Sequence, residues 1–212
     1  MTSIADIRKD YKLQSLNEED AGSPFQLFEK WWQEAVAAEI LEVNAMTLAT
    51  ASVDGVPSAR IVLLKGYNEK GFVFFSNYDS FKGRQLEENP RATLVFFWKE
   101  LERQVRITGL VSRTSEAESD EYYARRPDGS KLGAWASPQS QVIESRQWLE
   151  ANEKEFRDKF TNQSIPRPPH WGGYRVKPVN FEFWQGRSSR LHDRLQFVLL
   201  TDGVWQLERL AP

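Results

Sequence analysis

Apolar residues recur at two different intervals along the chain, and the interval changes near residue 45. Between residues 24 and 43, aromatic and aliphatic side chains recur every three or four positions, which is typical of one face of an α-helix. Ser23, Pro24 and Gln26 supply an N-cap, a first-turn proline and a capping-box partner. The pattern therefore predicts a helix over residues 24–43 that packs against a sheet.

From residue 45 onward the interval is two, which is typical of strands. Strands are predicted over residues 46–51, 58–65, 72–76, 92–98 and 103–112. Asp54-Gly55 and residues 68–71 supply turns, and a short helix is predicted over residues 80–88. Strands joined mostly by short turns favour an antiparallel meander that curls into a barrel over alternating strand and helix units.

The second half of the chain mixes helices and strands. A capping box at Ser115 and Glu118 predicts a helix to about residue 125, followed by a turn-rich segment and a long amphipathic helix. The turn-rich segment is expected over residues 126–135 and the long helix over residues 144–160. The last four strands are expected over residues 173–176, 179–184, 195–200 and 204–209. The whole pattern predicts one α+β domain over residues 23–212, preceded by a flexible polar arm at residues 1–22.

Composition narrows the classes to which the protein can belong. The 212 residues are 40% hydrophobic and 13% aromatic, which is ample for a large core. A net charge of −2, from 28 basic and 30 acidic residues, disfavours a sequence-independent nucleic-acid binder. The absence of cysteine and the presence of two histidines argue against disulfides and a metal site. No apolar run approaches the ~18 residues of a membrane span, so a soluble, cytoplasmic protein is expected.

The densest group of candidate functional residues is the segment 183–194. It follows a predicted strand and contains an indole, three arginines and a histidine. Arginine offers a planar fork of donors suited to phosphates and heterocycles, and histidine titrates near neutrality. The spacing of Arg190, His192 and Arg194 would direct all three side chains to one side of an extended chain. The alternative is a solvated loop whose charges pair with Asp193.

Three further groups of basic and polar residues are candidates for anion binding. They are Arg60 with Lys65 around an aliphatic strand, Lys82 with Arg84 at a helix start, and Tyr122 with Arg126 and Ser130. Cations placed beside apolar residues either reach solvent or hold an anion, and a helix N-terminus adds backbone donors for a phosphate. Since no glycine-rich nucleotide loop is present, we expect side chains and helix ends to hold two phosphorylated ligands side by side.

Several segments, in order along the chain, resemble the pyridoxine (pyridoxamine) 5′-phosphate oxidases. The likeness extends over nearly the whole chain and is most specific at RIVLLK (60–65), EENPR (87–91), LERQVR (101–106), GAW (133–135), WQG (184–186) and RLHDR (190–194). The resemblance implies an antiparallel FMN-binding split β-barrel with flanking helices. It also implies a homodimer with FMN at the interface.

The resemblance further implies which residues hold FMN. They are Arg60, Ile61, Val62, Leu63, Leu64, Lys65, Phe75, Ser76, Phe81, Lys82, Gln104, Gln139, Ser140, Trp184 and Arg194. The family usually has arginine just before the lysine, where Phe81 stands. We weigh two roles for Arg84: it replaces the missing arginine at the FMN phosphate, or it is a solvated residue that pairs with Glu87 or Glu88.

For the substrate, the resemblance implies a second set of residues. Lys65, Tyr122, Arg126 and Ser130 would bind its phosphate, Arg190 and His192 would act on the pyridine ring, and Arg8 and Tyr11 belong to the arm that covers it. The implied reaction oxidises pyridoxamine or pyridoxine 5′-phosphate to pyridoxal 5′-phosphate with dioxygen. Two alternatives stay open: another flavin reductase or haem-degrading relative on the same fold, and a non-catalytic binder of vitamin B6 phosphate.

Overall fold

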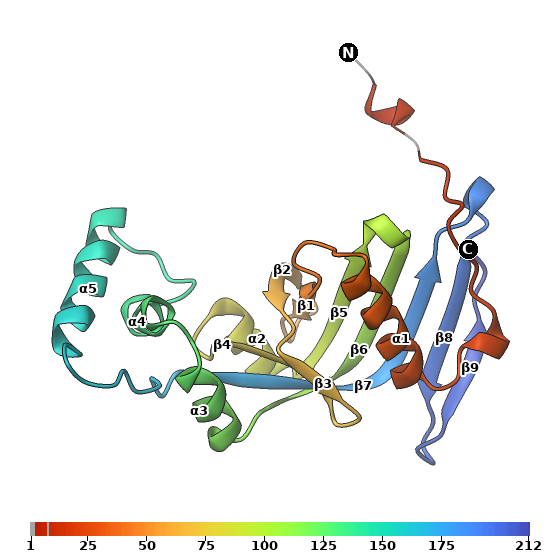
Figure 1. Cartoon of the computed structure of the whole chain (residues 1–212). Helices are drawn as coiled ribbons and strands as arrows, with labels where there is room; N and C mark the ends of the chain where they lie inside the picture. Colours follow the sequence, from red (N-terminus) through yellow and green to blue (C-terminus); the bar gives the residue numbers. More distant parts are fainter. Residues whose placement is uncertain (1–2, 8) are drawn as a thin grey trace.

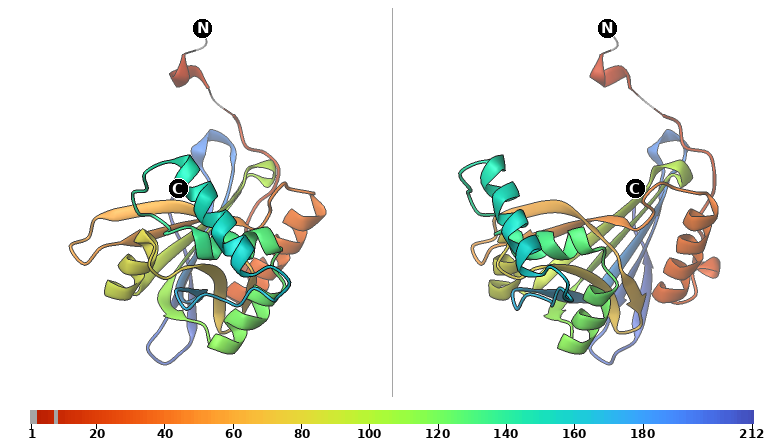
Figure 2. Two further views of the ribbon diagram at one scale, coloured as in Figure 1. Left: turned by 90° about the vertical axis from the view of Figure 1, so that its left-hand side faces the viewer. Right: turned by 60° about the vertical axis from the view of Figure 1, so that its left-hand side comes forward.

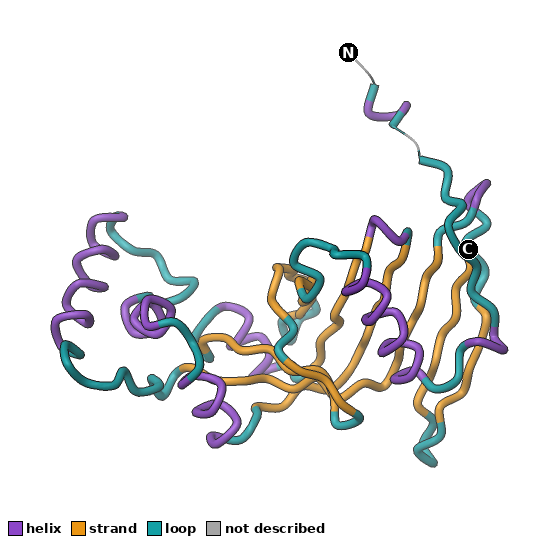
Figure 3. The backbone as a smooth tube through the Cα atoms, viewed as in Figure 1, coloured by secondary structure: helices purple, strands orange, loops and turns teal. Residues whose placement is uncertain are grey.

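The computed structural model describes residues 3–7 and 9–212, and within them nine strands form one antiparallel sheet (Figures 1 and 3). The sheet order is β2-β1-β5-β6-β7-β4-β3, with β8 on β7 and β9 on β8. The strands are β1 (Ala45–Ala51), β2 (Pro57–Leu63), β3 (Gly66–Asn68), β4 (Gly71–Asn77), β5 (Arg91–Trp98), β6 (Arg103–Arg113), β7 (Trp171–Gln185), β8 (Asp193–Leu199) and β9 (Trp205–Arg209).

The order of the strands makes the sheet curl. Its two ends, β2 and β3, are consecutive in the chain and separated only by Leu64 and Lys65. Close to this junction, the Lys65 N–H donates to the Val73 carbonyl of β4 over 2.8 Å. The long strand β7 pairs with β6 on one edge and divides the other edge between β4 (residues 171–176) and β8 (residues 180–185). The result is a barrel from which β8 and β9 diverge.

Five α-helices accompany the sheet in the described part of the chain. They are α1 (Pro24–Ala37), α2 (Phe81–Glu88), α3 (Glu116–Ala124), α4 (Asp128–Ala136) and α5 (Arg146–Lys159). Helices α3, α4 and α5 gather at one end of the barrel, whereas α1 lies against the sheet (Figures 1 and 2). None of the described helices is long and apolar enough to cross a membrane.

The core lies between α1 and the inner face of the sheet. Phe28 of α1 meets Phe72 and Phe96 edge to face, with ring centres 4.9 and 5.4 Å apart. Trp31 meets Phe183 in the same way at 5.3 Å. These aromatic pairs combine a large buried area with a preferred geometry, so they fix α1 on the sheet. The capping box at Ser23 and Gln26 begins α1 as predicted.

Three sequence predictions of local structure were wrong. Helix α1 ends at Ala37 and not at residue 43, because Glu39 takes a left-handed conformation and the chain turns toward β1. The segment that we expected to be turn-rich contains helix α4, which packs on α5 through Trp135 and Phe156. The two strands expected on either side of residues 177–178 form the single strand β7.

The last part of the N-terminal arm contacts the C-terminal strands. Arg209 of β9 forms ion pairs with Glu18 and with Asp193, and the Leu16 N–H donates to the Asp193 carboxylate over 3.1 Å. Leu16 itself is buried in the core. The end of the arm is therefore fixed to β8 and β9, and the flexibility expected for residues 1–22 stays a prediction.

Candidate active site

A cavity of about 870 Å³ opens between β2, β4 and the helices α3 and α4. It gathers residues from separate parts of the chain, and most of its lining residues are predicted site residues. Those that line it are Arg60, Ile61, Val62, Leu63, Lys65, Phe75, Ser76, Lys82, Tyr122, Arg126, Ser130 and Gln139. The structure thus brings the three predicted anion-binding groups, apart from Arg84, to one site.

The charge of this cavity is one-sided. Arg60, Lys65, Lys82 and Arg126 line it, and within the described chain no aspartate or glutamate does. Cations that share a pocket without acidic partners repel one another and lose hydration. Such an arrangement is stable chiefly when an anion supplies the missing charge. The cavity is therefore a site for a ligand with one or more phosphate or carboxylate groups.

Lys82 is the most deeply buried of the four cations, with 8% of its side chain exposed. Its Nζ donates only to neutral oxygens, those of Ser76 at 3.1 Å and of Ser80 and Gln139 at 3.4 Å. Burial, with a smaller contribution from the nearby Arg60 charge, lowers the pKa of Lys82 to about 8. The first turn of α2 positions Lys82, and the Ser80 hydroxyl caps that helix by accepting from the Gly83 N–H.

Arg60 is held from the strand side of the cavity. Its Nη1 donates to the Leu48 carbonyl at 3.0 Å and to the Thr50 hydroxyl at 2.7 Å, both on β1. Burial lowers the pKa of Arg60. Arginine stays protonated in proteins. Because the partners of Arg60 in the described chain are neutral, its positive charge beside Lys82 is not compensated.

An aromatic stack forms the opposite wall. Phe75 lies parallel to Tyr122 and to Trp171, with ring centres 3.9 and 5.5 Å apart. The Arg126 guanidinium lies over the Trp171 ring at 4.4 Å and donates through Nη2 to the Ser130 carbonyl at 3.0 Å. Its Nη1 is buried and has no hydrogen-bond partner in the described chain. A buried donor without an acceptor indicates a group that a ligand completes.

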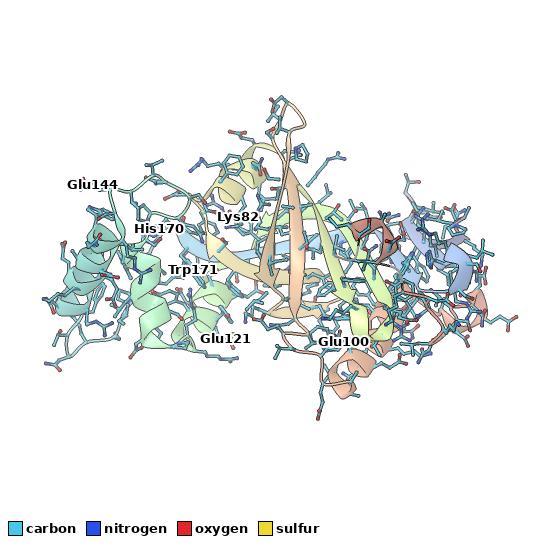
Figure 4. The ribbon with its side chains drawn as sticks, turned by 90° about the horizontal axis from the view of Figure 1, so that it is seen from above. Lys82, Glu100, Glu121, Glu144, His170 and Trp171 are labelled. Carbon is cyan, nitrogen blue, oxygen red and sulfur yellow. The ribbon has the colours of Figure 1, made fainter. Side chains whose placement is uncertain are left out.

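Trp171 is the main residue that sequence reasoning missed at this site. It follows the proline-rich linker and begins β7, and burial of an aromatic residue at the start of a strand is usually structural. Its role in the wall becomes visible only when α3 is placed against β7. Figure 4 shows Lys82 and Trp171 in the same part of the molecule, beside the helical end of the barrel.

Several predicted residues lie outside the cavity. Leu64 belongs to the core, Phe81 is half exposed on α2, and Ser140 is exposed with a φ of 69°. Arg84 donates to the Asp79 carbonyl and does not line the cavity, and Glu87 pairs with Arg113. Arg84 is thus a solvated residue whose partner is the Asp79 carbonyl and not Glu87 or Glu88, and its role at the FMN phosphate stays a prediction.

Gln104, Trp184 and Arg194 also lie outside the cavity, on the outer face of the sheet. The strand register places them side by side in one row across β6, β7 and β8, and Phe97 of β5 completes the row. The Arg194 guanidinium pairs with the buried carboxylate of Glu182 at 3.0 Å. This second group is thus a flat, partly charged and partly aromatic surface.

His192 and Tyr11 extend this second group. The rings of Trp184 and His192 have centres 4.6 Å apart, and Tyr11 meets Trp184 edge to face at 5.7 Å. The Arg187 N–H donates to Nδ1 of His192 at 3.0 Å, so the proton of a neutral imidazole is on Nε2. Arg8 lies outside the described residues.

The expected extended geometry of residues 190–194 was wrong. Arg190 ends the 3-10 helix Ser188–Arg190 with a φ of 62°, and regular strand begins only at Asp193. Arg190 and Arg194 therefore do not project from one continuous strand. The connection between β7 and β8 lies at the far end of the molecule from α4 (Figure 1). One chain therefore does not bring the residues of the cavity and those of the second group together.

The chain is similar to known proteins over its whole length. The family model described as "Pyridoxamine 5'-phosphate oxidase" matches residues 32–160. The model described as "Pyridoxine 5'-phosphate oxidase C-terminal dimerisation region" matches residues 171–212. A pyridoxine/pyridoxamine 5′-phosphate oxidase from Trichormus variabilis is 58% identical over 99% of both chains.

Two solved structures are also similar. PhzG from Burkholderia lata, in complex with tetrahydrophenazine-1-carboxylic acid, is 31% identical and covers 94% of this chain and 99% of its own, with a TM-score of 0.87. A pyridoxamine 5′-phosphate oxidase-related, FMN-binding protein from Nostoc punctiforme is 16% identical, covers 90% of this chain and 98% of its own, and has a TM-score of 0.70; it supports the fold alone. The split barrel, the matched regions and the full-length identity show that this chain belongs to the FMN-dependent pyridoxine/pyridoxamine 5′-phosphate oxidase family.

Proposed function

We propose that this protein oxidises pyridoxamine 5′-phosphate and pyridoxine 5′-phosphate to pyridoxal 5′-phosphate. Dioxygen is the acceptor and becomes hydrogen peroxide; with the amine substrate, water is consumed and ammonia is released. The observation that carries the proposal is the cavity with four cations, no acidic lining residue in the described chain, and a buried Arg126 donor without an acceptor. Membership of the family supports a vitamin B6 phosphate and FMN as the ligands of this site.

The residues of the cavity fit FMN in their chemistry. Arg60 and Lys82 would hold its phosphate, with Ser76 and Gln139 as neutral partners, and the aliphatic residues of β2 would pack against its ring system. FMN, when bound, would supply the redox chemistry, namely the oxidation of the substrate at the expense of dioxygen. The protein therefore needs to bind and orient, and no side chain has to act as a strong base.

The substrate phosphate would bind to the second pair of cations. Lys65 and Arg126 would supply charge, and Tyr122 and Ser130, which line the same cavity, would supply hydroxyl groups. The guanidinium of Arg126 is already oriented by Trp171 and the Ser130 carbonyl. A phosphate that accepts from the unpartnered Nη1 would therefore bind with little further ordering of the side chain.

The pyridine ring would contact Arg190 and His192. With Nδ1 occupied by the Arg187 N–H, a neutral His192 presents Nε2–H, which can donate to the phenolic oxygen of the substrate. We further propose that residues 1–22 cover this part of the site, with Arg8 and Tyr11 nearest the substrate, and that residues 23–212 form the single catalytic domain.

A homodimer would complete the site. We infer that FMN lies at the interface, between the cavity of one copy and the row of Gln104, Trp184 and Arg194 of its partner. Residues 171–212, which match the dimerisation region, include Trp184 and Arg194. Ile61 beside the cavity and Phe97 in the row are 65% and 57% exposed, which is unusual for large apolar residues and typical of an interface. A cytoplasmic location stays a prediction.

One experiment tests the function directly. We expect the purified protein to be yellow, and the flavin absorbance to bleach when pyridoxamine 5′-phosphate is added without oxygen. Admission of oxygen should restore the colour and yield pyridoxal 5′-phosphate and peroxide. A yellow protein that does not bleach would favour a binding protein or a flavin enzyme with another substrate.

A further inference from the structure

Glu102 is a buried acidic residue that the proposed site does not use. It stands in the segment 101–106, where the family resemblance gives a role only to Gln104. Glu102 and Arg103 are each 3% exposed. Acidic side chains are almost never fully buried without partners, so the contacts of this carboxylate indicate its role.

Within the described chain, all partners of the Glu102 carboxylate belong to the N-terminal arm. Oε2 accepts from the backbone N–H groups of Lys12 at 2.9 Å and Leu13 at 3.1 Å. Oε1 lies 3.2 Å from the Lys9 ammonium. Three donors on five consecutive residues therefore converge on one carboxylate, and hydrogen bonds to a charged acceptor are among the stronger kinds.

The backbone of Glu102 has a conformation that is unfavourable in free energy, and it fixes the position of the carboxylate. Glu102 has a φ of 56° and a ψ of 39°, in the left-handed region where glycine is favoured. Its carbonyl accepts from the Gly186 N–H at 2.7 Å and from Nε2 of Gln185 at 3.2 Å. Because the end of β7 fixes the backbone of Glu102, the side chain is presented to the arm in one orientation.

The arm segment that Glu102 holds carries Tyr11 to the second group of site residues. Gly186 makes this approach possible, since a Cβ there would lie 2.7 Å from Cγ of Tyr11 and 3.0 Å from Cβ of Glu102. The Tyr11 ring lies 6.0 Å from the ring of His192, measured between centres. Arg103 adds a second anchor, because its guanidinium donates to the side-chain oxygen of Gln14.

We propose that Glu102 is a positioning residue that clamps residues 9–13 and thereby holds Tyr11 beside His192 and Trp184. Its carboxylate acts through the arm and does not touch the substrate. The consequence for catalysis rests on the proposed function, since it takes the surroundings of His192 as the place where the pyridine binds. The clamp itself rests only on the contacts of Glu102.

The first test needs neither substrate nor activity. Trypsin cleaves after Lys9 and Lys12, and a clamped segment resists cleavage because the protease needs an extended, free backbone. In the FMN-loaded full-length protein we expect Glu102→Gln to speed cleavage after Lys12 about tenfold, and Glu102→Ala at least as much, because charge-assisted hydrogen bonds are lost. The matched control is Glu100→Gln in the same connection between β5 and β6, where Glu100 contacts Lys99 (Figure 4).

The second test asks whether the clamp acts through Tyr11. We expect Glu102→Gln to raise KM for pyridoxamine 5′-phosphate about tenfold, to change kcat less and to leave FMN occupancy unchanged. When Tyr11→Ala is already present, the same substitution should raise KM less than about twofold, because coupled residues are not additive.

The outcomes separate the two proposals. Equal cleavage rates in the wild type and Glu102→Gln, or the same rise in KM with and without Tyr11, would overturn the clamp. A wild-type protein that does not oxidise pyridoxamine 5′-phosphate would refute the proposed function, while a difference in cleavage would still establish the clamp.

Discussion

The Arg126 guanidinium lies 4.4 Å from the centre of the Trp171 ring, and the Nη1 of the same side chain is buried without a partner in the described chain. Stacking fixes the plane of the guanidinium, and one edge of its fork points to no protein acceptor. A buried N–H that lacks an acceptor costs ~1–3 kcal/mol. Burial also lowers the pKa of Arg126. Arg126 therefore presents an oriented donor that an anionic ligand could complete.

Replacement of Arg126 should weaken substrate binding more than the chemical step. Lysine keeps the charge but loses the planar fork, so we expect Arg126→Lys to raise KM for pyridoxamine 5′-phosphate about tenfold and Arg126→Gln to raise it further. Steady-state kinetics would measure both. The control is Arg125→Gln, because Arg125 is exposed and pairs with Glu121. A KM for Arg126→Gln within twofold of the wild type would contradict the assignment.

Lys82 should make FMN binding depend on pH. In the ligand-free protein its pKa is about 8, below the ordinary value of 10.5, so the folded state binds this proton less tightly than the unfolded chain. The contribution of Lys82 to stability therefore rises with pH between about 8 and 10.5. A bound phosphate reverses the effect, because its negative charge favours the protonated lysine. FMN binding should then take up a proton above pH 8, and Kd should rise by at most about tenfold per pH unit.

Titration of FMN into apo-protein at several pH values would measure this dependence. Lys82→Arg supplies the matched control, because arginine stays protonated throughout the range. We expect this variant to lose the rise in Kd near pH 8 while it retains affinity at neutral pH. If both proteins showed the same pH profile, Lys82 would not be the titrating group.

Arg190 should act on the substrate and not on the flavin. It ends a 3-10 turn at the far side of the molecule from Lys82 and does not line the cavity. We therefore expect Arg190→Ala to lose mainly kcat/KM, by about tenfold or more, and to purify with FMN bound. Absorbance of the purified variant gives the flavin content, and recovery of a colourless protein would contradict this role.

Phe97 should lie in the dimer interface. It is exposed in the row with Gln104 and Trp184, and a carboxylate buried there without a partner would cost several kcal/mol. We expect Phe97→Glu to raise the dimer dissociation constant at least about a hundredfold and to reduce FMN occupancy. Sedimentation would show this, with Gln147→Glu as the control because Gln147 is an exposed polar residue on α5. A Phe97→Glu dimer of unchanged stability would exclude this face.

Arg84 should be dispensable for FMN binding. Its guanidinium donates to the Asp79 carbonyl on the outside of α2, although the family usually has an arginine where Phe81 stands. We expect Arg84→Ala to leave the Kd for FMN within about twofold and its salt dependence unchanged, whereas Lys82→Ala should weaken binding about tenfold or more. A loss of affinity in Arg84→Ala that disappears at high salt would show that Arg84 turns to the phosphate when FMN binds.

The strands and most helices could be predicted because their signals are local. Alternation marks β1 and β2, and the capping boxes at Ser23 and Ser115 begin α1 and α3 where expected. Helix α4 was missed because Gly129 and Gly133 disfavour helices. It forms because Leu132 and Ala136 are buried on one face and Trp135 packs on α5, which is tertiary packing that local propensity does not contain.

Strand β7 was divided in two because its alternation changes phase. Tyr174 and Val176 face the core, and so do Phe181 and Phe183, although an even number of residues lies between Val176 and Phe181, which in a regular strand would place them on opposite faces. The register against β6 passes from Asn180 to Pro178, so one residue between them bulges and restores the inward direction. Pro178 sits at this bulge, where its missing N–H is tolerated.

The cations of the cavity could be proposed from residue types, but their grouping could not. Arg60, Lys82 and Arg126 stand on β2, α2 and the end of α3, and only the closed barrel brings them together. The left-handed φ of Arg190 likewise had no local signal, since arginine rarely adopts it. Only the family resemblance predicted a shared site for the residues of the cavity and those of the second group, because these lie far from each other in one chain.

Strand β7 also sets the distance between the cavity and the outer row of residues. It begins at Trp171 in the cavity wall and passes Trp184 in the outer row, and its 15 residues rise ~3.3 Å each. Insertion or deletion of one residue along this strand, unless a bulge absorbs it as the one beside Pro178 does, would exchange its inner and outer faces beyond that point and turn Trp184 into the core and Phe183 into solvent. The distance between the cavity wall at Trp171 and the outer row at Trp184 is therefore set by the length of this one strand, and not by the loops or helices around it.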